Sequence, residues 1–289
     1  MKIYNFLFLF FLIGISGQNL EKKAREITDE GIILYRSEMA SWHGTDVFLA
    51  NYQNRENIGG YFSYIDEGVP KCIFFSKNNQ VIGTISFPTN YKSENAQIDL
   101  KARDFSNTEN EYAAIRKGAL ERIKTDSIFK FYNNTDFNLI PIIRNNSKKV
   151  YVLTGPKGNN TVLFGNDYLI DFNRKNEITK VQRLHKSLIS QKIVDEEVGK
   201  TVSGVHSHML EDWPYMTPTD ICTLMLYQNL THWESYNVVN KKYFSIWNSK
   251  TNNLVILLTD VIKKINDDQQ KRNPETQDTA SDIPKKIRN

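Results

Sequence analysis

The sequence predicts an α/β (α+β) fold, in which a mixed sheet with flanking helices follows a smaller α+β region. Short apolar runs rich in β-branched residues and bounded by turn residues predict strands, most of them after Phe137. Separate segments have the apolar spacing and start signals of helices. Because 40% of the 289 residues are hydrophobic and 12% are aromatic, the chain can bury a substantial core.

The first residues are typical of a secretory signal peptide. Lys2 supplies a positive charge, Phe6 to Ile13 is an unbroken apolar run, and Gly14, Ser16 and Gly17 are small. We expect residues 1–17 to be removed, with cleavage after Ser16 or Gly17, and the mature protein to be secreted or periplasmic. An uncleaved N-terminal anchor is the alternative. After cleavage, no second apolar run has transmembrane length, so we expect no stable membrane span.

The charge balance argues against nucleic acid as a partner. The chain has 37 basic and 33 acidic residues, and loss of Lys2 leaves a net charge of +3. Positive charges are scattered apart from the tail, whereas nucleic-acid binding favours a basic patch. The expected partner is a protein or peptide, and the sequence carries no signal for the oligomeric state.

Residues 18–133 are predicted to form the N-terminal α+β region. The pattern is helical from Asn19 to Tyr35, and Cys72 to Ser76 with Val81 to Phe87 predicts a β-hairpin. Ser106 to Glu109 is a capping box that opens a further helix.

A polar cluster follows the first helix. It consists of Arg36, Ser37 and Glu38 beside Trp42 and His43, and it either lines a cleft or is a solvated helix end.

Cys72 and Cys222 each lie inside an apolar element. One disulfide between them is compatible with an oxidising compartment, but we favour two small buried hydrophobes.

Residues 134–265 are predicted to form the second domain, after a turn-rich break at Asn133 to Asp136. Strands are expected at Leu139–Ile143, Val150–Leu153, Thr161–Phe164, Asp167–Phe172, Ile178–Ile189, Tyr236–Val239 and Tyr243–Trp247. Leu254–Ile265 is a strand, a helix or one followed by the other, and residues 266–289 form a polar tail expected to be disordered.

The segment from Thr201 to Asp220 carries the most specific pattern. A β-branched run ends in His206 and His208, whose side chains share one face of the predicted strand. Thr217 is a predicted N-cap, with Asp220 in the first turn of the next helix. Two imidazoles and a carboxylate that meet in this way form a zinc site with a fourth position for water. A capped helix and two hydrogen-bonded histidines are the structural alternative.

This pattern resembles the signature of the JAMM (MPN+) metallopeptidase family, which is His-x-His, seven residues, then Ser-x-x-Asp. The chain departs from it in three ways: eight residues separate the two parts, Thr217 replaces Ser, and Met209 replaces the usual Pro. The resemblance implies an MPN-like domain over residues 134–265. It also implies Zn²⁺ held by His206, His208 and Asp220, and hydrolysis of amide bonds.

The resemblance also implies a general base and an oxyanion donor. Thr217 takes the place of the family's Ser, whose hydroxyl stabilises the oxyanion. The family's Glu has no counterpart on the matching strand, so Asp167 is the first candidate for the base and Glu38 the second. Glu196 and Glu197 are better explained as part of a flexible loop.

Two further histidines and two aromatic residues accompany this motif. His185 is an alternative ligand, but we favour a histidine beside the sheet; His232 lies at a helix C-terminus and receives no role. Trp213 and Tyr215 either form a substrate wall or pack the loop.

Two functions follow. The first is an exported zinc-dependent hydrolase of amide bonds, similar to a peptidase or isopeptidase. The second is a non-catalytic binding or interaction module on a degenerate MPN scaffold in the cell envelope.

Overall fold

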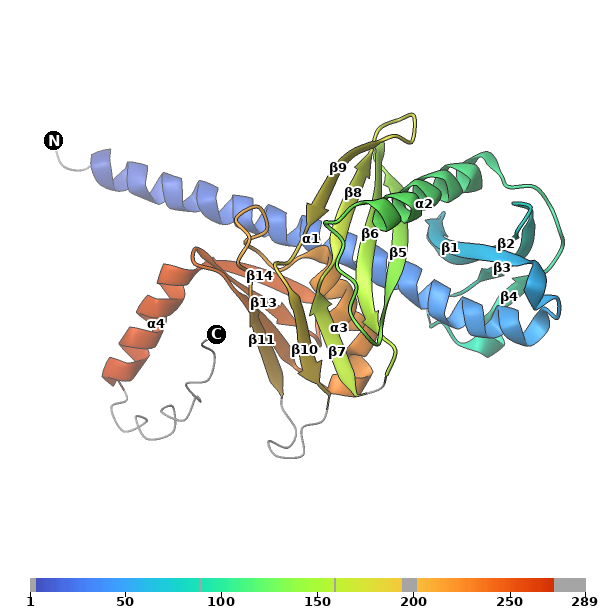
Figure 1. Ribbon diagram of the computed structural model, residues 1–289. Helices are drawn as coiled ribbons and strands as arrows, with labels where there is room; N and C mark the ends of the chain where they lie inside the picture. Colours follow the sequence, from blue (N-terminus) through green and yellow to red (C-terminus); the bar gives the residue numbers. More distant parts are fainter. Residues whose placement is uncertain (1–3, 89, 159, 194–201, 273–289) are drawn as a thin grey trace.

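The computed structural model describes residues 4–88, 90–158, 160–193 and 202–272 (Figure 1). Within these ranges the fold is α+β, as predicted, with four α-helices and four small sheets, one of them mixed. Two 3-10 turns, Arg55–Asn57 and Ser93–Asn95, lie in connecting segments.

A long helix, α1 (Tyr4–Asn51), runs along the molecule and contacts most other parts of it (Figure 1). The predicted helix ended at Tyr35, but α1 continues because Ala40, Val47 and Phe48 recur at helical spacing and are buried against the N-terminal sheet. The predicted signal peptide would form the first part of α1, and its cleavage stays a prediction.

The N-terminal lobe is an antiparallel sheet in the order β1-β2-β3-β4. Its strands are β1 (Ile58–Asp66), β2 (Val69–Ser76), β3 (Val81–Ser86) and β4 (Gln97–Asp99). The predicted hairpin is therefore confirmed as β2–β3.

The central sheet is antiparallel in the order β5-β6-β8-β9. Its strands are β5 (Thr135–Arg144), β6 (Ser147–Pro156), β8 (Tyr168–Phe172) and β9 (Ile178–Arg183). The helix α2 (Asn107–Thr125), which begins at the predicted capping box, covers one face of this sheet. Leu34 of α1 and Cys222 pack on the other face. Both helices belong to the predicted region 18–133, but each packs against the central sheet of the predicted region 134–265.

The last part of the chain contains the mixed sheet, in which β11 (Ser203–Ser207) is parallel to β12 (Ser235–Val239). The sheet continues through β13 (Tyr243–Asn248) and β14 (Asn253–Leu258), and α3 (Pro218–Thr231) connects β11 to β12. A separate pair joins β7 (Thr161–Gly165) to β10 (Leu188–Lys192).

Besides the longer first helix, the strand predicted from Ile178 and the predicted tail differ from the structure. The strand predicted from Ile178 to Ile189 breaks after Arg183, because its second part leaves the central sheet to pair with β7. Leu254 to Ile265 is a strand followed by a helix, one of the predicted alternatives, but α4 (Thr259–Arg272) continues into residues predicted as a disordered tail. The rest of that tail lies outside the described residues.

Both cysteines are buried and free, in separate hydrophobic clusters, as favoured from the sequence. Among the described residues, no helix has an apolar stretch long enough to cross a membrane.

Candidate metal centre

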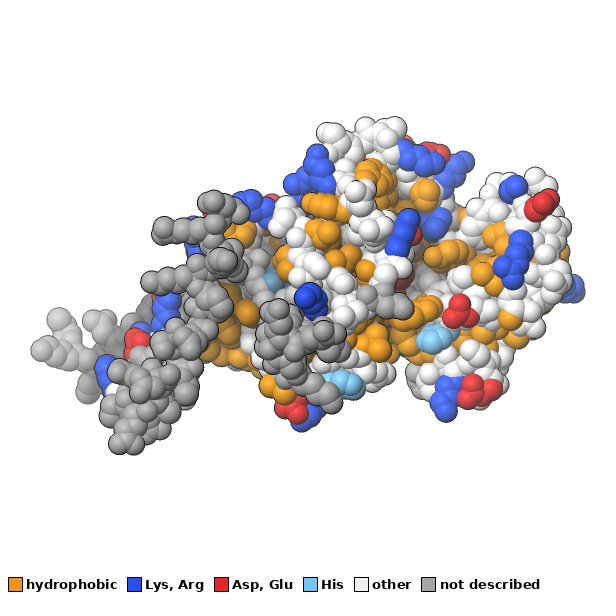
Figure 2. Space-filling model, turned by 60° about the horizontal axis from the view of Figure 1, so that its bottom comes forward, with side chains coloured by type: hydrophobic (Ala, Val, Ile, Leu, Met, Phe, Trp, Pro, Cys, Tyr) orange, Lys and Arg blue, Asp and Glu red, His pale blue; other side chains and the backbone are white. Residues whose placement is uncertain are grey.

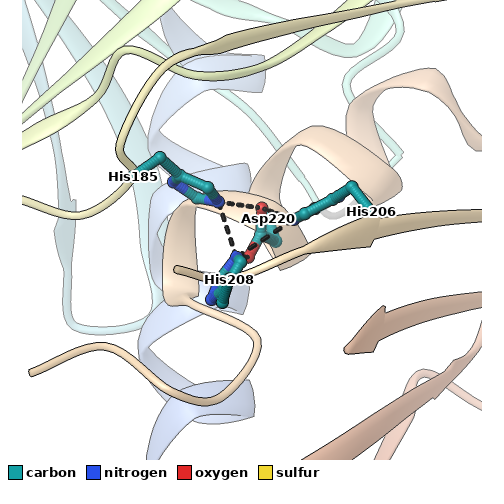
Figure 3. Close-up of side chains that lie close together, drawn as sticks. All are labelled: His185, His206, His208 and Asp220. Atoms are coloured by element: carbon teal, nitrogen blue, oxygen red, sulfur yellow. Dashed lines mark hydrogen bonds and ion pairs between the residues drawn. The ribbon is translucent and has the colours of Figure 1, made fainter. Parts of the chain in front are cut away.

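Three imidazoles and one carboxylate point toward one another in the interior of the C-terminal part (Figure 3). They belong to the turn between β9 and β10, to the end of β11 and to the first turn of α3. Their ligand atoms all lie within 4.8 Å of one another, and each residue exposes at most 7% of its surface. The four residues are His185, His206, His208 and Asp220.

The mixed sheet fixes the two histidines of the His-x-His motif. His206 lies in β11, and His208 extends the strand because its N–H donates to the Val239 carbonyl at 2.9 Å. The Asn240 amide donates to the carbonyl of His208 at 2.9 Å. The alternation of side chains along the strand then places both imidazoles on one face, as predicted.

The capped start of α3 fixes the carboxylate. Thr217 is the N-cap, and its N–H and hydroxyl each donate to Asp220 Oδ2 at 2.8 Å. The other oxygen, Oδ1, accepts no hydrogen bond from the described residues, although it is buried. It faces Nε2 of His185 at 3.1 Å and Nε2 of His206 at 3.5 Å. A buried carboxylate oxygen without a donor calls for a positively charged partner. A metal ion would supply that charge, and so would a protonated His185, whose pKa Asp167 and Asp220 hold well above its ordinary value despite burial.

His185 joins the cluster from the turn that follows β9. Its Nδ1 lies 2.7 Å from Asp167 Oδ1, and the Thr219 hydroxyl donates to the other oxygen of Asp167. The turn approaches very closely to Gly165, which has a φ of 74°. A Cβ at Gly165 would collide with the Ser187 carbonyl and lie 3.0 Å from the His185 Cβ, so this position requires glycine.

The hydrogen bonds determine which ring nitrogens are free. Nδ1 of His208 lies 3.0 Å from the Trp213 carbonyl, which can only accept, so this nitrogen carries the proton. Nδ1 of His185 donates to the Asp167 carboxylate in the same way. The two Nε2 atoms then present lone pairs to each other at 2.7 Å and repel unless a metal ion or a proton lies between them.

Burial and neighbouring charges shift the pKa values within the cluster. Burial lowers the pKa of His206 to about 4, which favours the neutral, metal-binding imidazole. Burial alone would raise the pKa of Asp220, but the adjacent His185 and His206 hold that pKa well below its usual range. Asp220 is therefore ionised at neutral pH.

The donor set and spacing fit a tetrahedral ion. Tetrahedral zinc with Zn–N distances of about 2.0–2.1 Å separates neighbouring ligand atoms by about 3.3 Å. Five separations among the four ligand groups run from 2.7 Å to 3.5 Å, and all ligand atoms lie within 4.8 Å of one another. The space beside Asp220, bordered by Asp167 and Thr219, holds about 10 Å³, close to one water molecule. The cluster is a closed, four-ligand arrangement that could hold a metal ion.

Of the three residues predicted for catalysis, Asp167 and Thr217 lie beside the cluster and Glu38 does not. Asp167 contacts His185 and Thr219 through its two oxygens, and Thr217 is directed at Asp220. Glu38 does not join the cluster; its side chain lines a different pocket, bordered by Tyr227. Glu196 and Glu197 lie outside the described residues.

His185 joins the cluster, although the sequence favours a histidine beside the sheet and leaves a ligand as the alternative. It lies in a turn rather than in a strand, and it faces the other three residues. The available signal was composition: three of the chain's five histidines lie between His185 and His208. His232 is the C-cap residue of α3, as expected.

The two aromatic residues of the loop before α3 are half-buried. Trp213 supplies the carbonyl that His208 contacts, and the ring of Tyr215 lies 4.5 Å from that of Tyr243. Both side chains pack against hydrophobic clusters, which is the packing alternative from the sequence.

Comparisons with protein-family models, curated proteins and solved structures gave no match. The candidate metal centre is therefore interpreted from its own geometry.

Proposed function

We propose that the protein holds a zinc ion as a structural ion through His185, His206, His208 and Asp220, and that it is a non-catalytic binding module. The observation that carries this proposal is the fourth ligand. Catalytic zinc sites keep a position open for water, whereas structural sites fill all four with protein ligands. Here His185 takes the fourth position, and the cluster is buried at every ligand.

Surrounding contacts support a site built for a metal. Each imidazole is oriented through Nδ1, by Asp167, Tyr236 or a main-chain carbonyl. Such contacts fix the tautomer and direction of metal-ligating histidines. Histidine and aspartate ligands also avoid thiol oxidation, so the site suits the exported location that we propose from the N-terminal sequence. The His-x-His strand followed by an Asp-bearing helix is the support for a degenerate MPN scaffold.

A zinc-dependent hydrolase of amide bonds is the second candidate, favoured by one observation. His185 is the only one of the four ligands that lies in a turn between strands, and Asp167 contacts it at 2.7 Å. If His185 left the ion, the remaining three ligands would match a catalytic site, and the Asp167–His185 pair would stand beside the open position as a general base.

The variant His185→Ala separates the two candidates. Protein expressed with zinc should contain close to one zinc per chain. For a structural site, His185→Ala should lose the zinc and unfold at a markedly lower temperature. The control is His232→Asn, which changes an exposed histidine whose φ of 55° asparagine tolerates.

The alternative outcomes are distinct. If His185→Ala retains zinc and stability but loses hydrolysis of a peptide library that the wild type cleaves, the hydrolase is correct. A folded wild-type protein that contains no metal after expression and dialysis with zinc would rule out both candidates.

A further inference from the structure

A second site lies about two helical turns along α3 from Asp220, at the seam between the N-terminal lobe and the rest of the molecule. It is an open pocket of about 290 Å³, near the lower limit for small-molecule sites. Figure 2 shows hydrophobic side chains gathered along this seam. The lining residues are Glu38, Ser41, Trp42, Thr45, Asp46, Tyr61, Asn138, Leu226 and Tyr227.

One face of α1 supplies a row of side chains to the pocket. Glu38, Trp42 and Asp46 are spaced four residues apart, so they lie above one another on the helix. This row contains part of the polar cluster in which the sequence left a cleft and a solvated helix end as alternatives. The helix continues past it, and the row lines a pocket.

Three other elements close the pocket. Tyr61 comes from β1, Asn138 from β5 and Tyr227 from α3. Trp42 is 53% exposed and lies at the mouth, where its ring stacks on His43 with centroids 5.8 Å apart. The walls thus combine two carboxyl groups with three aromatic rings.

The charges of the pocket are unbalanced. Arg116 is the cation that acts on the pKa of Glu38, but it lies over the ring of Tyr61, 5.5 Å from the centroid, and does not line the pocket. Burial raises the pKa of Glu38 to about 7, and Arg116 and a hydrogen bond with Asn138 offset this only in part. Glu38 and Asp46 line the pocket with no Lys or Arg among the other lining residues, so a cation inside the pocket would complete the balance.

We propose that this pocket binds a protonated primary amine, such as the side chain of a lysine residue in a peptide partner. An alkylammonium group donates three hydrogen bonds to acceptors such as Glu38 and Asn138. Aromatic rings attract the same group through their faces, and a solvent-exposed tryptophan at the entrance is well suited to this. This pocket is separate from the candidate metal centre, and the proposal does not depend on metal binding there.

Isothermal titration of the full chain with Nα-acetyl-lysine methylamide tests the proposal. The matched probe is Nα-acetyl-norleucine methylamide, which has a similar side chain without the amine. We expect saturable binding of the lysine probe and at least about tenfold weaker binding of the norleucine probe, because hydrogen bonds to charged groups are worth this much.

Two variants assign the binding to the pocket. Glu38→Gln should weaken the lysine probe about tenfold, and Trp42→Ala by about two- to fivefold. Glu234→Gln, at an exposed ion pair with Lys250, should have no effect. Between pH 6 and pH 8 the wild-type affinity should rise, because Glu38 must be ionised to hold the amine, whereas that of Glu38→Gln should stay constant.

Equal affinity for the two probes, or unchanged binding in Glu38→Gln, would overturn the proposal. The absence of binding at millimolar lysine probe would do the same.

Discussion

The candidate metal centre and the pocket at the lobe seam each remove a carboxylate from water, but with opposite results. Asp220 is 1% exposed, yet its pKa is well below the usual range. Glu38 is half-buried, and its pKa is raised to about 7. Burial acts in the same direction on both, so the partners decide the charge state.

Those partners differ in number and closeness. Asp220 has three imidazoles around it and two hydrogen bonds from Thr217 at 2.8 Å. Glu38 has one guanidinium, that of Arg116, one hydrogen bond with Asn138 and an open pocket. A closed cluster of this kind suits a resident ion, whereas an open pocket suits a ligand that supplies its own charge.

The largest expected effect that tests this comparison is that of Asp220→Ala. The change leaves three converging imidazoles and the Thr217 donors buried without an acceptor. We expect loss of zinc and a decrease of about 3–5 kcal/mol in the free energy of unfolding, because removing one partner of a buried ionic group is costly. Urea denaturation followed by circular dichroism measures it.

The control is again Glu234→Gln, where the ion pair with Lys250 is solvent-exposed. That change should cost less than about 1 kcal/mol. Similar values for the two variants would show that the cluster does not stabilise the fold.

The two regions also differ in how far the sequence could predict them. His206, His208 and Asp220 were recognised because strand alternation and the helix cap are local features, and the structure brings these residues together. His185 was only an alternative ligand, because its position depends on the end of β9 at Arg183 and on the close approach of the turn to Gly165, which no local pattern reveals. For the polar cluster around Glu38, the sequence left a cleft and a solvated helix end as alternatives. It could not decide between them, because Tyr61, Asn138 and Tyr227 reach the pocket from three separate elements.

A smaller effect is expected for Asp167→Asn, which changes a residue that orients His185 without touching the ion. An asparagine keeps the shape but loses the charge that holds the imidazole, so zinc affinity should fall about 10- to 100-fold. Competition with a chromophoric chelator measures this affinity. The matched control is Asp171→Asn. Asp171 lies in the central sheet and accepts a hydrogen bond from Gln182, so this change should leave the zinc affinity unaltered.

If Asp167→Asn bound zinc as tightly as the wild type, His185 would be held by the turn alone. If it kept zinc but lost a hydrolytic activity of the wild type, Asp167 would regain the catalytic role predicted from the sequence.

The smallest expected effect is the pH dependence of stability that Glu38 contributes. Its pKa is about 7 in the folded protein and about 4.5 in the unfolded chain, so the folded state binds the extra proton between these values. The contribution of Glu38 to stability is therefore fully present below pH 4.5. It is lost as the pH rises through 7, because the charged form is then buried. The charged and titratable groups around it are Arg116, Asp46, Tyr61, Tyr227, Cys72 and Cys222.

Glu38→Gln removes this titration. The variant should match the wild type at pH 5 and exceed it at pH 8 by about 1–2 kcal/mol in the free energy of unfolding, less than the full shift because part of the side chain reaches solvent. Urea denaturation at the two pH values measures the difference. With saturating lysine probe at pH 8 the order should reverse, because the bound amine stabilises the ionised Glu38 of the wild type and not the glutamine. A variant that loses stability at pH 8 without any probe would show that Glu38 already has a compensating partner inside the fold, and the contrast with Asp220 would then disappear.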